Sequence, residues 1–196
     1  SGVIILMMVT LYKFIGSRRL LRNSCSLDAG GIRQAIARVR RKLDIKQRVK
    51  LVFSREMEIP CVVGLFSPVL ILPANATTWD QNKLNSVLFH ELAHVRRKDT
   101  IRLLLLDLAT ALSWMNPLIW WASRKSKLEM ENSCDNFVIN AGVKRTDYAM
   151  QLFDFITLLS KAGKAPTGAM TMARKSTLES RVSSILDKNN HRKPLS

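Results

Sequence analysis

The sequence predicts an α+β fold, a mainly helical domain with a small β-sheet ahead of its central helix, together with membrane-associated helices. Short runs rich in Val, Ile, Leu and Phe are grouped between residues 49 and 73, as expected of strands. Several segments with helical spacing of apolar residues follow them. Two longer apolar stretches, at residues 3–15 and 101–122, have basic residues beside them. The length of 196 residues suits one ordinary domain or a smaller domain with membrane segments.

The composition favours a membrane surface over nucleic acid. The chain is 47% hydrophobic but has 31 Lys and Arg against 15 Asp and Glu, a formal net charge of +16. Most basic clusters flank apolar runs, which is typical of the cytoplasmic flanks of membrane segments. Because no base-reading motif occurs, we expect no specific nucleic-acid partner. The three cysteines have no C-x-x-C spacing, so a reducing, cytoplasmic setting fits better than a disulfide scaffold.

The first apolar stretch is too short to cross a bilayer as it stands. Thirteen helical residues rise about 20 Å, against a hydrocarbon core of roughly 30 Å. We therefore expect a truncated transmembrane helix at residues 1–16 and a basic juxtamembrane linker at residues 17–31. A buried amphipathic helix is the alternative for this stretch.

The next segments predict a helix, a small sheet and a capped helix. Apolar residues at helical spacing predict a helix over 32–43. Strands are expected over 49–53, 60–65 and 69–73, with a turn between the last two. An edge strand of this sheet could pair with an extended peptide by strand addition, and an ordinary hairpin without this role is the alternative. Asp80 is expected to cap a helix over 81–98.

The second apolar stretch, residues 101–122, is interrupted by Arg102, Asp107 and Asn116-Pro117. These interruptions predict a helical hairpin or re-entrant element packed partly in the bilayer, with a soluble core helix as the alternative. Its tryptophans would be interfacial anchors. Further helices are expected over 127–141, 147–159 and 177–186, with Gly142 as a helix stop, a mobile segment over 163–171 and a disordered basic tail over 188–196.

The helix over 81–98 contains the sequence His90-Glu91-Leu92-Ala93-His94. Four residues advance a helix by about 400°, so both imidazoles project from one face, one turn apart. This spacing allows two neutral nitrogens to reach one zinc ion at roughly 2.0–2.1 Å. Glu91 lies beside them, where it can act as a general base. The pattern favours a zinc hydrolase.

A catalytic zinc site also needs a third protein ligand. His191 lies in the basic tail and is a poor candidate. Glu131 and Asp135 are four residues apart and share a helix face, so one could bind zinc while the other accepts an N–H from a zinc-bound histidine. Glu129 would face away. Asp99, Asp107 and Cys134 are also candidates for the third ligand, and the acidic pair could instead be a merely solvated patch.

Three groups of residues together resemble a known family. They are His90–His94 followed by Arg96-Arg97-Lys98-Asp99, the segment Trp114-Met115-Asn116-Pro117-Leu118-Ile119-Trp120, and Glu131-Asn132-Ser133-Cys134-Asp135. The combination is similar to the BlaR/MecR-type membrane metallopeptidases, which are gluzincins, and the resemblance covers about residues 33–186. It implies one zinc ion per chain at His90, His94 and Glu131. It also implies Glu91 as general base and acid, and Asp135 as the support of a histidine.

The resemblance further implies a cytoplasm-facing peptidase domain, here residues 32–187, at the cell membrane. In antibiotic-sensing members an extracellular penicillin-binding sensor activates this domain, which cleaves a transcriptional repressor and often itself. This sequence contains no S-x-x-K motif, so we expect the protease segment of a longer sensor or a member with another output. The expected substrate is a cytoplasmic protein or the chain itself, with residues 163–176 as a candidate self-cleavage segment. Tyr148 is one candidate for stabilising the oxyanion, although nothing in the sequence selects it.

Two rival functions are also compatible with the sequence. A catalytically silent relative would keep zinc for structure and serve as a membrane interaction module, and Glu91 is the residue that separates it from a peptidase. A nucleic-acid binder explained by the net charge would bind with a steep dependence on salt.

Overall fold

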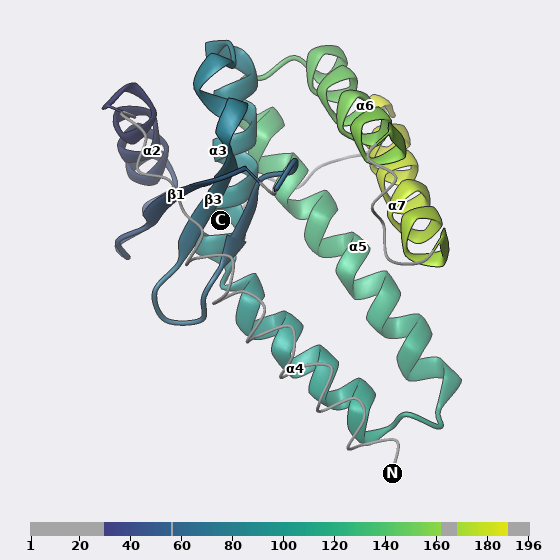
Figure 1. Cartoon of the computed structure of the whole chain (residues 1–196). Helices are drawn as coiled ribbons and strands as arrows, with labels where there is room; N and C mark the ends of the chain where they lie inside the picture. Colours follow the sequence, from purple (N-terminus) through teal and green to yellow (C-terminus); the bar gives the residue numbers. More distant parts are fainter. Residues whose placement is uncertain (1–29, 56, 162–167, 188–196) are drawn as a thin grey trace.

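The computed structural model describes residues 30–55, 57–161 and 168–187. The elements in chain order are α2 (Gly30–Lys42), β1 (Lys50–Ser54), β2 (Cys61–Val63), β3 (Val69–Pro73), the 3-10 turn η1 (Ala74–Thr78), α3 (Gln81–Arg97), α4 (Asp99–Leu112), α5 (Pro117–Asn140), α6 (Arg145–Lys161) and α7 (Gly168–Leu186) (Figure 1). This arrangement confirms the prediction of a mainly helical α+β fold with a small sheet before α3. The segments expected at 1–16 and 188–196 lie outside the described residues, as does most of the linker expected at 17–31, whose last two residues, Gly30 and Gly31, instead begin α2.

The three strands form one mixed sheet in the order β1-β3-β2. β1 runs parallel to β3, with Val52 opposite Ile71, and β2 runs antiparallel to it. All five residues of the central strand β3 are buried, which explains its continuous apolar sequence. The turn between β2 and β3 begins at Gly64, whose φ is +98° and where a Cβ would collide with the Ser67 carbonyl oxygen. The turn therefore requires glycine at this position.

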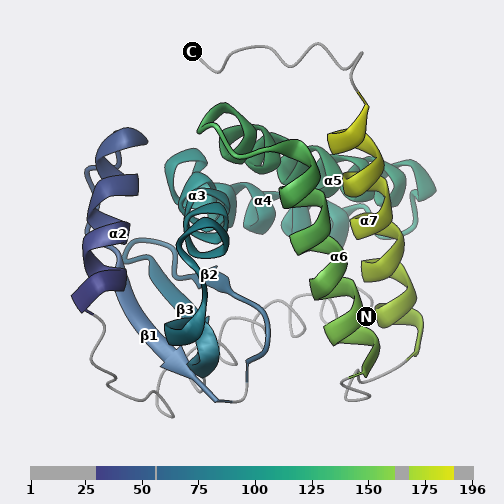
Figure 2. The same ribbon diagram turned by 90° about the horizontal axis from the view of Figure 1, so that it is seen from above.

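Two helices, α2 and α3, lie side by side next to the sheet and share a core with it (Figure 2). On α2 the buried residues Ile32, Ala35, Ile36 and Val39 follow the spacing of one helix face. Fully burying an isoleucine or valine side chain stabilises the fold by about 1.5–3 kcal/mol. The core therefore holds α3 by one face, and the histidines project from the opposite face.

The helix α3 has defined caps at both ends. Asp80 caps its N-terminus, because the Asp80 carboxylate accepts a hydrogen bond of 2.8 Å from the backbone N–H of Lys83. The helix ends at Lys98, which has a left-handed backbone with φ of 55°. The chain turns there, and α4 begins at the next residue, Asp99. The H-E-x-x-H sequence thus occupies the second half of a well-anchored helix.

The stretch 101–122 forms most of a helical hairpin made by α4 and the first part of α5, as expected, and this hairpin extends away from the sheet (Figure 1). The break lies between Leu112 and Pro117, where the Asn116 side chain accepts a hydrogen bond of 3.0 Å from the Leu118 N–H. Pro117 is the first residue of α5, the position where its missing N–H costs nothing. Within the described ranges, no helix has both the length and the apolar character needed to cross a bilayer.

Two predicted boundaries were wrong. The helix expected over 127–141 is not separate, because α5 runs without interruption from Pro117 to Asn140. The polar run at 123–127 contains no helix breaker, so its polarity changed the exposure of the helix and not its continuity. Likewise α7 begins at Gly168 and not at 177, so the part of the expected mobile segment over 168–171 is helical. Alanine and methionine at 169–173 favour that extension, and residues 162–167 lie outside the described ranges.

The last two helices, α6 and α7, lie side by side as a pair on the far side of α3 from α2 (Figure 2). α5 ends at Asn140, and Gly142, with φ of +94°, donates its N–H to the Ile139 carbonyl oxygen. This is the expected glycine stop. The pair places side chains of α6 and α7 against the face of α3 and α5 that carries the histidines and acidic residues.

Candidate metal centre

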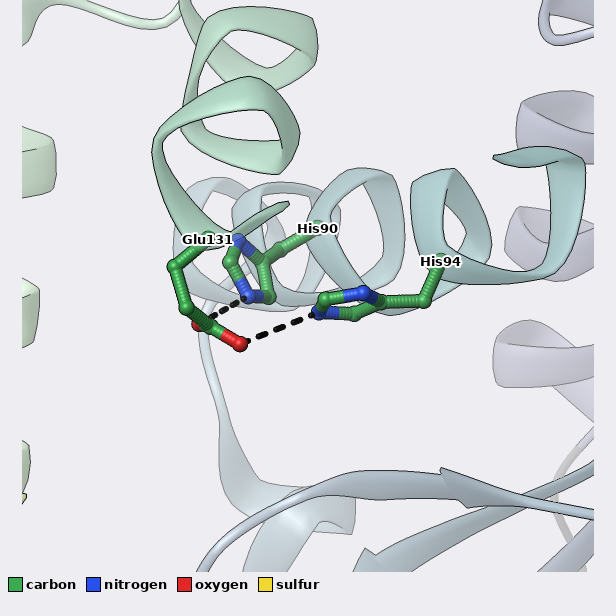
Figure 3. Close-up of side chains that lie close together, drawn as sticks. All are labelled: His90, His94 and Glu131. Atoms are coloured by element: carbon green, nitrogen blue, oxygen red, sulfur yellow. Dashed lines mark ion pairs between the residues drawn. The ribbon is translucent and has the colours of Figure 1, made fainter. Parts of the chain in front are cut away.

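Two helices bring the predicted ligands together. His90 and His94 project from α3, and Glu131 projects toward them from α5 (Figure 3). The Nε2 atom of His90 lies 3.5 Å from Glu131 Oε2, and the Nε2 atom of His94 lies 3.7 Å from Glu131 Oε1. One ligand atom from each of the three residues can be chosen so that all lie within 4.8 Å of one another. Both imidazoles are therefore directed at one carboxylate.

The Nδ1 atom of each histidine also contacts a further carboxylate. Asp135 Oδ1 lies 3.1 Å from His90 Nδ1, and Asp99 Oδ2 lies 2.9 Å from His94 Nδ1. A carboxylate at Nδ1 favours the tautomer that carries its proton there. The Nε2 lone pairs of both histidines are then available on the side that faces Glu131.

The donor set fits a zinc ion. Two imidazole nitrogens and one carboxylate, with a position left for water or substrate, are what catalytic zinc sites use. The carboxylates behind both histidines supply the outer hydrogen bonds that such sites need. Within the described ranges, the only other group of three with suitable spacing is His94, Asp99 and Cys134.

That second group is a weaker match. Cys134 is completely buried, and its Sγ lies 3.3 Å from His94 Nδ1, on the side away from Glu131. Burial, together with the negative charge of Asp99, raises the pKa of the Cys134 thiol well above its usual range. Cys134 thus contacts the ring nitrogen of His94 that also faces Asp99, and not the Nε2 atoms that converge on Glu131.

The remaining acidic candidates lie elsewhere. Asp107 pairs with Lys127 at 2.9 Å across the α4–α5 hairpin. Glu129 pairs with the exposed Lys125 at 3.2 Å, and it faces away from Glu131 as expected. His191 is outside the described residues. Of the acidic candidates for a third ligand, Glu131 alone lies beside the Nε2 atoms of both histidines.

Glu91 lines a pocket beside His90. The pocket has a volume of about 90 Å³, and its walls come from the loop before β2 and from α3, α6 and α7. Its lining residues are Ile59, Pro60, Val87, His90, Glu91, Tyr148, Gln151, Leu152, Phe155, Leu178 and Arg181. Burial raises the pKa of Glu91 from its usual value, and the nearby histidines only partly oppose this. A buried carboxylate with a raised pKa accepts a proton more readily than an exposed one, which suits a general base.

The charges at the centre are strongly coupled. Burial disfavours the charged form of His90, but its hydrogen bonds to Asp135 and Glu131 outweigh burial and raise its pKa to about 9. Burial also opposes ionisation of Glu131, yet His90 and Arg181 lower its pKa to about 2. Without a metal ion, the site therefore favours a protonated histidine beside ionised carboxylates. A bound cation would take the place of that proton.

Sequence reasoning missed two features of the site. Asp99 was only one of several acidic candidates, but it is 1% exposed and contacts His94 and Arg97. Its position five residues after His94, directly after the Lys98 cap of α3, could have indicated this role. Arg181 on α7 was not considered, although it contacts both Glu131 and Asp135. No local pattern marks it, since it is 46 residues from Asp135.

Tyr148 is placed differently from a free catalytic donor. It is 3% exposed, and its hydroxyl donates a hydrogen bond of 2.7 Å to Asp135 Oδ1 and lies 3.1 Å from His90 Nδ1. An oxyanion role would need this hydroxyl to leave Asp135. In the observed arrangement, Tyr148 supports the histidine side of the centre.

The grouping of two helical histidines with a glutamate from a second helix is the type of donor set that zinc peptidases use. The chain belongs to the M56 peptidase family, because the family model described as "BlaR1 peptidase M56" matches residues 1–185. This confirms the resemblance based on the H-E-x-x-H and E-x-x-x-D motifs.

Individual relatives carry regulatory names. The chain is 30% identical over 138 residues to "Regulatory protein BlaR1" of Bacillus licheniformis, a match that covers 70% of this chain and 23% of that protein. It is 24% identical over 118 residues to the "Methicillin resistance mecR1 protein" of Staphylococcus aureus and of Staphylococcus epidermidis, covering 59% of this chain and 20% of each relative. The chain thus spans less than a quarter of the length of these relatives.

Proposed function

We propose that this chain is the zinc-dependent endopeptidase domain of a membrane-anchored signalling protein. One zinc ion would be held by His90, His94 and Glu131, with Asp135 and Asp99 supporting the two histidines. The observation that carries the proposal is the convergence of both Nε2 atoms on Glu131, with a carboxylate behind each Nδ1 atom. Membership of a peptidase family supports the reaction class.

The chain's own residues have separate tasks in the proposed reaction. When bound, zinc supplies Lewis acidity, which acidifies a water molecule and polarises a peptide carbonyl. Glu91 takes the proton from the attacking water and delivers it to the leaving amine, a task for which its raised pKa is suited. The edge strand β2 lies against α3 and offers backbone groups to an extended substrate. The apolar wall of the pocket suits an aliphatic or aromatic side chain next to the bond that is cut.

The substrate class follows from the relatives and stays a proposal. Their names describe regulation and methicillin resistance, so we propose a cytoplasmic protein, such as a transcriptional repressor or the chain itself, as the substrate. A catalytically silent zinc-binding interaction module is the rival function, and it predicts that Glu91 is dispensable.

The test compares the purified zinc-loaded chain in detergent with its Glu91→Gln variant. Both are incubated with a library of unstructured peptides, and new termini are identified by mass spectrometry. We expect cleavage by the original chain, a loss of at least 100-fold in Glu91→Gln because general acid–base catalysis contributes roughly 10²–10⁴-fold, and equal zinc content in both. Identical cleavage patterns, or none from either protein, would refute the peptidase proposal and leave the silent module.

The location at the membrane has its own structural support. The end of the α4–α5 hairpin exposes a group of large apolar side chains: Leu104, Leu105, Leu108, Leu112, Trp114, Met115, Leu118, Trp120 and Trp121. Apolar surface of this extent marks a membrane or protein contact, and Arg124 and Lys125 follow on α5, where they would face anionic headgroups. We propose that this end of the hairpin packs into the cytoplasmic leaflet without crossing it.

Tryptophan fluorescence can test this location, because three of the four tryptophans lie on the hairpin and the fourth, Trp79, packs against the core. Variants that keep only Trp121 or only Trp79 are reconstituted in vesicles with brominated lipids. We expect strong quenching of Trp121, which is 68% exposed, and little quenching of Trp79. Equal quenching of the two residues would contradict the proposed depth.

A further inference from the structure

Arg181 is a buried arginine that joins the last helix to the metal centre. It lies on α7 and is 6% exposed. Its Nε and Nη2 atoms donate to the two oxygens of Asp135 at 2.8 Å and 2.6 Å. Its Nη1 atom lies 2.9 Å from Glu131 Oε2. One guanidinium group therefore contacts both acidic residues that α5 contributes to the site.

The geometry of these contacts indicates what Arg181 can do. All three of its nitrogens face carboxylates, and a planar guanidinium imposes a fixed direction on each of them. These contacts use one N–H group from each of its three nitrogens. The orientation of the guanidinium is therefore set by the two carboxylates, and Arg181 in turn orients them.

The two carboxylates need such a partner. Glu131, Asp135 and Glu91 surround His90, and like charges at close range in a buried site repel one another. Arg181 offsets this repulsion and holds Glu131 with Oε2 on the guanidinium and Oε1 toward His94. It also fixes Asp135, whose Oδ1 atom faces His90 Nδ1. Both the third ligand and the support of the first ligand are thereby oriented from α7.

We propose that Arg181 is a positioning residue of the metal centre, which orients Glu131 and Asp135 and so makes α7 part of the site, although all three candidate ligands precede it in the chain. This inference rests on the proposed zinc centre. It does not depend on catalysis, because it concerns metal affinity and ligand geometry.

An opposite role for Arg181 is physically reasonable and makes the inference testable. A guanidinium that contacts Glu131 could act as a competitor that occupies the carboxylate until a cation displaces it. Removing a competitor would strengthen zinc binding. Removing a positioning residue would weaken it, since loss of an outer partner typically costs 10–100-fold in metal affinity.

The experiment measures zinc affinity of the purified full chain in detergent by competition with a chromophoric chelator. The variants are Arg181→Met, which removes the positive charge and the planar guanidinium, and Arg181→Lys, which keeps the positive charge but not the planar guanidinium. The matched control is Arg145→Met, because Arg145 also reaches the end of α7, through the Asp187 carbonyl oxygen at 3.3 Å, but touches neither carboxylate. Far-UV circular dichroism verifies folding, and the visible spectrum of the cobalt-loaded protein reports ligand geometry.

We expect zinc affinity to fall about 10–100-fold in Arg181→Met and less in Arg181→Lys, with altered cobalt spectra in both. Arg145→Met should match the original chain in both measurements. Unchanged or tighter zinc binding by Arg181→Met would overturn the inference, as would an equal loss in Arg145→Met. If Arg181→Met fails to fold, the inference is tested with Arg181→Lys alone. An unchanged zinc affinity and an unchanged cobalt spectrum in Arg181→Lys would refute the positioning role. A chain that binds no stoichiometric zinc at all would instead refute the proposed function.

Discussion

Replacing Asp135 by asparagine removes one negative charge from the most densely bonded carboxylate near the metal centre. Asp135 is 2% exposed and faces two nitrogens of Arg181, the hydroxyl of Tyr148 and Nδ1 of His90. Asparagine has nearly the same shape, but its amide NH₂ cannot accept from Arg181. Arg181 would then be a buried cation with only Glu131 as its ionic partner.

The expected cost is about 3–5 kcal/mol of the free energy of unfolding, the range for breaking one side of a buried ion pair. Against a total stability of roughly 5–15 kcal/mol for a domain, this loss is a large fraction, so the variant should unfold at a clearly lower urea concentration. The measurement is urea denaturation of the zinc-free chain, followed by circular dichroism. Glu129→Gln is the control on the same helix, because Glu129 pairs only with the exposed Lys125 and should change stability by less than about 0.5 kcal/mol.

A double variant tests whether the energy belongs to the Asp135–Arg181 pair. If Asp135→Asn leaves an unpaired cation, adding Arg181→Met should recover part of the lost stability, since both charges are then absent. A loss below about 1 kcal/mol in Asp135→Asn, or strictly additive losses in the double variant, would refute the reasoning that this pair is a coupled, desolvated contact.

Three further predictions concern pH, the β2–β3 turn and the start of α3. The pKa of Glu131 is about 2 when folded and that of His90 about 9. Ionised Glu131 therefore stabilises the folded chain above its unfolded pKa of about 4.3, and this stability is lost as the pH falls toward 2. Protonated His90 stabilises the folded chain at low pH, and this stability is lost as the pH rises from about 6.5 to 9. The zinc-free chain should thus be most stable between about pH 4.5 and 6.5, and a urea midpoint that rises steadily from pH 6 to 9 would contradict this assignment. Gly64→Ala should destabilise the chain by about 1–3 kcal/mol, since it combines a positive φ with a close contact to Ser67, whereas Gly31→Ala meets no atom within 4 Å and should leave the melting temperature nearly unchanged. Asp80→Ala should cost about 1 kcal/mol through loss of the cap of α3, and Asp80→Asn, which keeps an acceptor, should restore most of it in thermal unfolding.

The parts of the fold that depend on local sequence were predictable. The three strands, the Asp80 cap, the break at Asn116-Pro117 and the stop at Gly142 each rest on residues within a few positions of the feature they produce. The two wrong boundaries, at 127 and 177, were placed where polar or small residues suggested loops. Helix continuity depends on propensity summed over the whole segment and on packing, which a change in polarity does not reveal.

The sequence by itself determined that two histidines and Glu91 share one helix and that Glu131 and Asp135 share a face of another, because helical periodicity fixes which side chains lie together. Only the tertiary structure decided which carboxylate serves which histidine. The crossing of α3 and α5 directs Glu131 to both Nε2 atoms and Asp135 to His90, and the turn at Lys98 brings Asp99 to His94. The contact of Arg181 with Asp135 spans 46 residues and depends on how α7 packs against α5. Long-range contacts of this kind leave no periodic trace in the chain, so they emerge only once the helices are assembled.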